Sequence, residues 1–135
     1  MNSLEKTTEA IKLEKSQSLD DLVEKSWIYV EGIEDRIKLV KAELRRKLDS
    51  QEPIDTKLEI EKIKFDLEKI GSIQQEITSK FLEIAPQHEA DKSNVSIMLQ
   101  IPRLEKVGSA SLFIIAELEH IADRFRGIEL NKIWL

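Results

Sequence analysis

Apolar residues recur along this chain at alternating steps of three and four, the spacing of one face of an α-helix that packs on another helix. The first such run spans residues 19–49, and Ser26 occupies the one position that breaks it. Because Pro53 can stand only near the start of a following helix, the run ends before it. We predict a helix over about 19–49 with Ser18 as its N-cap. Its apolar seam consists of Leu19, Val23, Val30, Ile33, Ile37, Val40 and Leu44.

The second run predicts a helix over about 54–85 with a nearly unbroken seam. Gln74 is the polar member of that seam, and Pro86 is expected to end the helix. Gly71 followed by Ser72 leaves open a break within it, which would give the protein four helices instead of three. The seam consists of Ile60, Ile63, Leu67, Ile70, Ile77, Phe81 and Ile84.

A third helix is predicted over about 94–126, capped by Ser93 or Asn94. Pro102 either kinks this helix or marks its true start. Gly127 is the expected C-cap, which leaves an apolar tail at 128–135. Gly108 and Ser111 fill two positions of a seam that otherwise contains Ile97, Ile101, Leu104, Ile115, Leu118, Ala122 and Phe125.

Short connections make consecutive helices antiparallel neighbours, so the fold class is all-α, an antiparallel three-helix or possibly four-helix bundle. The basic end of the first helix would lie beside acidic residues that follow Pro53, which favours a long, coiled-coil-like helical hairpin. Residues 1–17 carry few apolar anchors and are predicted to be a flexible arm or a frayed helix. Residues 18–135 would then form a single helical domain.

Composition narrows the classes of function. The formal net charge is −5, which disfavours nucleic-acid partners because a phosphate backbone attracts basic surfaces. Cysteine is absent, which excludes disulfides and thiolate chemistry and fits a reducing, cytoplasmic location. No run of apolar residues approaches the length of about 20 that a transmembrane helix needs.

Few residues offer site chemistry. Glu117 and His120 match the Glu-x-x-His spacing of di-iron bundles, but a rotation of about 100° per residue places His120 on the solvent side. His88, Glu89 and Asp91 fall in a predicted surface loop where spacing fixes no partner. We therefore assign no catalytic residue, metal ligand or cofactor, and we expect that the protein is not an enzyme.

Two functions other than simple helix packing stay open at this point. Gly108 and Ser111, together with Gln74, place small or polar side chains in the seams, where they would line a pocket of a small enzyme or ligand-binding protein. Residues 36–47, from Arg36 to Lys47, are rich in cations and form a weaker candidate for binding anionic surfaces.

The most informative feature is an excess of large apolar residues outside the seams. Leu58 and Phe65 lie roughly opposite Ile63 and Leu67, so a single three-helix core cannot bury both faces. The second stripe needs a cover, either the chain's own ends or another protein. We predict a non-catalytic protein–protein interaction module, an adaptor, scaffold subunit or assembly factor, which binds a protein partner or itself as a homodimer. Its predicted contact residues are Trp27, Ile28, Leu39, Leu58, Phe65, Phe113, Ile133 and Trp134.

Overall fold

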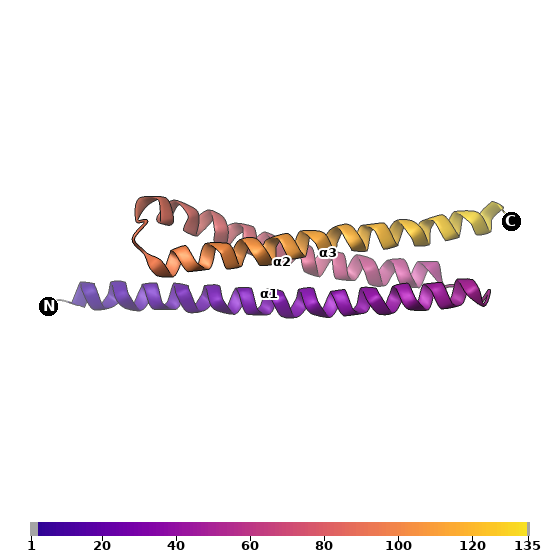
Figure 1. Cartoon of the computed structure of the whole chain (residues 1–135), viewed down its shortest axis with the longest axis horizontal. Helices are drawn as coiled ribbons and strands as arrows, with labels where there is room; N and C mark the ends of the chain where they lie inside the picture. The colour runs from indigo at the N-terminus through magenta and orange to yellow at the C-terminus, as the bar shows by residue number, and fades with distance from the viewer. Residues whose placement is uncertain (1–2, 135) are drawn as a thin grey trace.

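The chain folds into three long α-helices, as predicted (Figure 1). The structure is a computed structural model that describes the backbone of residues 3–134 and the side chains of residues 19–131. Helix α1 spans Ser3–Asp49, α2 spans Thr56–Ala90 and α3 spans Val95–Trp134. At 1.5 Å per residue these helices are about 70, 52 and 60 Å long.

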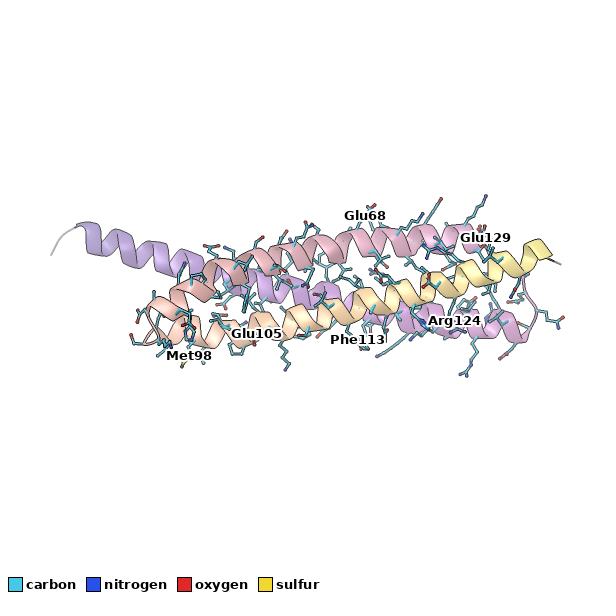
Figure 2. All side chains as sticks on the ribbon, turned by 90° about the horizontal axis from the view of Figure 1, so that it is seen from above. Glu68, Met98, Glu105, Phe113, Arg124 and Glu129 are labelled. Carbon is cyan, nitrogen blue, oxygen red and sulfur yellow. The ribbon has the colours of Figure 1, made fainter. Side chains whose placement is uncertain are left out.

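The helices run up, down and up, so that α2 is antiparallel to both α1 and α3 (Figure 1). Helix α1 is the longest, and its N-terminal end extends past the turn that joins α2 to α3 in both views (Figures 1 and 2). Two short connections, residues 50–55 and 91–94, produce this order. The predicted antiparallel three-helix bundle is therefore confirmed.

Buried apolar residues form two clusters along the bundle. One is built around Ile33, Ile70 and Phe125, which come from the three different helices. The other lies nearer the α2–α3 turn and includes Val23 of α1 and Leu104 of α3. Burial of these side chains supplies the main favourable free energy of folding, about 25 cal/mol for each Å² of apolar surface removed from water.

The buried positions agree with the predicted seam of α1 and revise that of α3. On α1 every predicted seam residue is buried except Val40, which is half-buried. On α3 the buried series steps by three and four without a break, and it contains three residues that the prediction left out: Val107, Ile114 and Ile121. The predicted members Ile97, Ile101 and Ile115 lie at the margin of the core instead.

Helices α2 and α3 make the most extensive contact, whereas α1 and α2 make the least. Small side chains allow this close approach. A Cβ atom added to Gly108 of α3 would lie 3.4 Å from Cγ2 of Ile77 on α2. Next to it, Ser111 is fully buried. The first two helices do form the predicted hairpin, but the tightest pair in the bundle is the second and third.

The beginnings of the helices differ from the predicted ones in two places. Helix α1 begins at Ser3 and runs through Ser18, so Ser18 is not an N-cap and residues 3–17 have helical backbone. That segment contains no Gly or Pro and is rich in good helix formers. Helix α2 begins at Thr56 rather than at residue 54, because the Asp55 side chain caps it by accepting a 3.1 Å hydrogen bond from the Leu58 N–H. Asn94 caps α3 as predicted, accepting from the Ile97 N–H at 3.3 Å.

The helices continue through Pro86, Pro102 and Gly71, each of which was considered as a possible helix boundary. Pro86 lies within α2, which ends instead at Ala90, where the Asp91 N–H bonds to the Gln87 carbonyl. Pro102 lies within α3, which starts at Val95. The side chain of Asn94 caps this start, so Pro102 is not the beginning of the helix. Gly71 does not split α2, so the four-helix alternative is wrong.

The predicted C-cap at Gly127 and the separate tail at 128–135 are also wrong for the described residues. No glycine of the described backbone has a positive φ, the conformation that a glycine C-cap adopts. Helix α3 continues through Gly127 to Trp134, and Ile128 packs against the core cluster that contains Phe125. The apolar residues past Gly127 therefore extend the helix. Within the described part of the chain, no helix has both the length and the apolar character that crossing a membrane requires.

Candidate interaction surface

Five of the predicted contact residues project from the bundle. Their exposed fractions are 65% for Ile28, 70% for Leu39, 45% for Leu58, 57% for Phe65 and 64% for Phe113. Isolated apolar side chains on a surface are ordinary, so the arrangement of these five decides whether they form a contact surface.

The other three predicted contact residues do not support a surface. Trp27 is half-buried and packs against both core clusters, so its ring is used inside the bundle. A tryptophan flanking the α1 seam covers the boundary between the clusters, which heptad spacing alone did not reveal. The side chains of Ile133 and Trp134 lie outside those that the structure describes.

Four of the exposed residues lie on the side of the bundle that α1 and α2 share. Residues three or four apart are neighbours on a helix surface. Ile28 follows Lys25, and Leu39 follows Arg36, by three residues. Both of these cations reach across to α2: Arg36 pairs with Asp66 at 2.7 Å and Lys25 pairs with Glu76 at 3.8 Å. Ile28 and Leu39 therefore lie toward the α2 side of α1's outer surface.

Phe65 lies on the matching side of α2. The Nζ atom of Lys69 is 4.6 Å from the centroid of the Phe65 ring and 5.7 Å from that of Tyr29 on α1. Lys69 therefore connects Phe65 to the first helix by cation–π contacts. Leu58 is seven residues before Phe65 and shares its side of α2. We call the surface formed by Ile28, Leu39, Leu58 and Phe65 the α1/α2 face.

A groove of about 310 Å³ separates the C-terminal half of α1 from the start of α2. Its apolar lining includes Leu39, Leu44 and Ile54, with Phe125 of α3 beneath. Charged side chains border the groove, among them Arg36, Glu43, Lys47, Glu59 and Lys62. The groove exists because α1 and α2 make the least contact of the three helix pairs. An apolar floor with a charged border is the usual anatomy of a protein–protein contact.

The end of this groove is braced by ion pairs around Arg46. Its guanidinium donates to Glu43 at 2.6 Å and pairs with Glu52 of the α1–α2 turn at 2.8 Å. The hydrogen bond from Arg46 lowers the pKa of Glu43 below its ordinary value, and the same bond raises the pKa of Arg46 further above its own. These groups are exposed, so they orient the turn and add little to stability.

Phe113 belongs to a different side of the molecule. It precedes Glu117 of α3 by four residues, and Glu117 pairs with Lys41 of α1 at 3.8 Å. Phe113 therefore lies on the side shared by α1 and α3, and Figure 2 places it at the edge of α3 away from α2. The structure thus places four of the predicted residues along the side that α1 and α2 share, and the fifth on another side.

Sequence reasoning missed further exposed apolar residues. Near the α2–α3 turn these are Leu82 of α2 and Val95, Met98 and Leu99 of α3, and Met98 is visible at that end in Figure 2. Each of these four lies outside the buried series of its helix, which is the signal in the sequence that could have identified it. Leu48, Leu112 and Leu130 are exposed as well.

The basic stretch from Arg36 to Lys47 is largely engaged within the chain. Arg36 and Arg46 pair with carboxylates as described above, Lys38 pairs with Glu34 at 3.8 Å, and Lys41 pairs with Glu117. Pairing of these cations neutralises much of the positive field that an anionic surface would need.

The seam around Gln74 and Ser111 is filled by protein atoms. The Ser111 hydroxyl hydrogen-bonds to Oε1 of Gln74 and lies 2.8 Å from the Gly108 carbonyl oxygen. Ser111 is fully buried, and Gly108 lies close to Ile77. The small and polar residues here permit close packing of α2 and α3, and this geometry does not favour the predicted pocket.

The candidate metal and acid–base residues are dispersed. His88 and Glu89 lie in the last turn of α2 rather than in a loop, and the carboxylate of Asp91 accepts a 2.5 Å hydrogen bond from the Ser93 hydroxyl. No group of three or more metal-ligating side chains occurs among the described residues. Comparison of the chain with protein families, curated proteins and solved structures finds no match.

Proposed function

We propose that this protein is a non-catalytic interaction module that binds a protein partner, or another copy of itself, by helix–helix packing. The observation that carries the proposal is the α1/α2 face, where four large apolar side chains gather on adjacent helices beside an apolar groove. A surface of this kind fits an amphipathic helix, whose apolar residues repeat at the same spacing. The roles of adaptor, scaffold subunit or assembly factor are specific forms of this function.

Removal of the apolar character of the α1/α2 face tests the proposal. We expect the double variant Leu58→Glu/Phe65→Glu to lose self-association and the capture of partner proteins, because a buried unpaired carboxylate strongly opposes association. The matched control is Leu112→Glu/Leu130→Glu, which adds the same charge at exposed apolar positions of α3, away from the α1/α2 face. Multi-angle light scattering and cross-linking in native extract measure the two kinds of binding.

Circular dichroism of both variants would show whether the helices persist. Equal binding by the wild type and by Leu58→Glu/Phe65→Glu, with helices intact, would exclude this face as the binding surface. A wild-type chain that binds neither itself nor any partner would contradict the proposed function as a whole.

A further inference from the structure

We infer that a second copy of this chain docks on the α1/α2 face with its α1 antiparallel to the first. The inference rests on the proposed function and specifies its partner, orientation and register. It begins with symmetry: an interface between two identical chains related by a two-fold axis pairs residue i with residue j and residue j with residue i. A helix suited to such pairing must carry complementary groups at equal distances on either side of one point.

Helix α1 carries this arrangement on its outer surface. Ile28 and Leu39 are both exposed and lie eleven residues apart, a rotation of only about 20° at 100° per residue. When two α1 helices run antiparallel about the midpoint between these residues, Ile28 faces the partner's Leu39. Each copy therefore contributes two large apolar side chains, and both pairs are covered simultaneously.

Gly32 lies close to the centre of this stripe. A Cβ atom added there would meet only the Arg36 guanidinium, at 3.9 Å, so no contact within the chain requires a glycine. A glycine inside a helix is unfavourable by about 1 kcal/mol relative to alanine. Its lack of a side chain would allow the two α1 backbones to approach closely at the symmetry axis, as Gly108 does between α2 and α3 within the chain.

Charge supports the same register. In the antiparallel pairing about that midpoint, Asp21 faces the partner's Arg46, because both residues lie in line with the Ile28–Leu39 stripe. Among the described side chains Asp21 has no ion-pair partner within the chain, and Arg46 pairs with Glu43 and Glu52 of its own chain. The acidic half of α1 would thus meet its basic half, whereas parallel pairing would align like charges.

Phe65 adds apolar surface at the axis. Its neighbour Asp66 pairs with Arg36, so Phe65 lies at the level of residues close to the α1 midpoint. Two-fold symmetry then places the Phe65 side chains of both copies close to the level of the axis, one beside each α1 helix. The α1/α2 face as a whole, rather than α1 alone, is therefore the contact surface.

Disulfide trapping tests the register directly, because the chain contains no cysteine. An equal mixture of Ile28→Cys and Leu39→Cys proteins should give a mixed disulfide dimer on mild oxidation. Either protein alone should give much less, since equivalent Ile28 positions would be about 17 Å apart along the helix and a disulfide needs Cα atoms within about 7 Å. Leu112→Cys and Leu130→Cys, at exposed positions on α3, provide the background for random collision.

Charge reversal gives an independent measurement. Asp21→Lys should raise the Kd of the dimer about tenfold, because it sets a cation against the partner's Arg46. Glu105→Lys makes the same charge change at an exposed position of α3 and should leave the Kd unchanged. Sedimentation equilibrium measures both, and thermal unfolding of the dilute variants verifies that each is folded.

The outcomes separate this inference from the proposed function. Mixed disulfides in excess of both single proteins and of the Leu112→Cys background support the antiparallel register. A wild type that is monomeric throughout, or that cross-links only between identical positions, overturns it. If that monomer still captures a different protein, and Leu58→Glu/Phe65→Glu abolishes the capture, the inference fails while the proposed function stands.

Discussion

The α2–α3 seam and the α1/α2 face differ in how closely their helices pack. In the seam, Gly108 and Ser111 permit two helices to approach so closely that side chains and backbone fill the space between them. On the α1/α2 face the helices make less contact, ion pairs such as Arg36–Asp66 bridge them, and large apolar residues such as Leu39 remain exposed. One region is closed within the chain, and the other leaves large apolar side chains exposed.

The comparison shows that apolar character alone does not separate core from contact surface in a helical bundle. What separates them is the size of the side chains between the helices. Small residues bring α2 and α3 together and seal their seam, whereas the longer side chains between α1 and α2 leave a groove floored by Phe125. Stability should therefore depend on the first region and association on the second.

The largest expected difference between the regions is in the cost of truncating a phenylalanine. Phe125→Ala should lower the free energy of unfolding by about 3–5 kcal/mol, because it empties a fully buried site. Phe65→Ala should change it by no more than about 1 kcal/mol, which covers its cation–π contact with Lys69. Urea denaturation of the two variants measures both values. Equal losses would mean that Phe65 is part of the core and the comparison is mistaken.

A smaller effect, of opposite sign in the two regions, is expected for glycine. Gly108→Leu should destabilise the chain by about 1–3 kcal/mol, because the added side chain has no room beside Ile77. Gly32→Leu should stabilise the isolated chain by up to about 1 kcal/mol, since the helix gains propensity and the site is open. Thermal unfolding at protein concentrations that keep the chain monomeric tests both. Destabilisation by Gly32→Leu would indicate a hidden contact within the chain.

The smallest effect concerns the pH dependence at the end of the α1/α2 groove. The hydrogen bond from Arg46 lowers the pKa of Glu43 in the folded chain below its ordinary value. The folded state therefore binds fewer protons than the unfolded state, and the contribution of Glu43 to stability is present above its unfolded pKa and is lost as pH falls through its folded pKa. Glu43→Gln should flatten the acid limb of the stability profile slightly. A profile identical to that of the wild type would show that the bond contributes nothing in solution.

The heptad pattern predicted much of the fold. It predicted the three helices, the buried seam of α1 and the antiparallel order, and the charges of α1 and α2 predicted the ion pairs that Arg36 and Arg46 form. It was less successful on α3, where Gly108 and Ser111 obscured the regular buried series through Val107, Ile114 and Ile121. The predictions that α2 ends at Pro86 and α3 at Gly127 were wrong. Burial of neighbouring residues such as Ile84 and Phe125 outweighs the low helix propensity of proline and glycine.

The candidate surface was only partly predictable. The exposure of Leu58 and Phe65 followed from their position opposite the α2 seam. Trp27 also lies outside its predicted seam, but it is half-buried and packs against both core clusters. The groove beside Leu39 could not be predicted from the sequence, since its size depends on how far α1 and α2 lie apart. A residue's direction from its own helix does not specify what faces it.

For this protein the sequence by itself determined the helices and the direction in which each side chain leaves its helix axis, because both follow from local spacing. Only the tertiary structure decided which pair of helices packs closely, which apolar residues the core uses and which remain exposed. These outcomes depend on the distances between helices, and the distances follow from side-chain volumes that meet across the bundle from far apart in the chain. The α2–α3 seam closes where Gly108 meets Ile77, whereas α1 and α2 make the least contact and are bridged by long side chains such as Arg36 and Asp66.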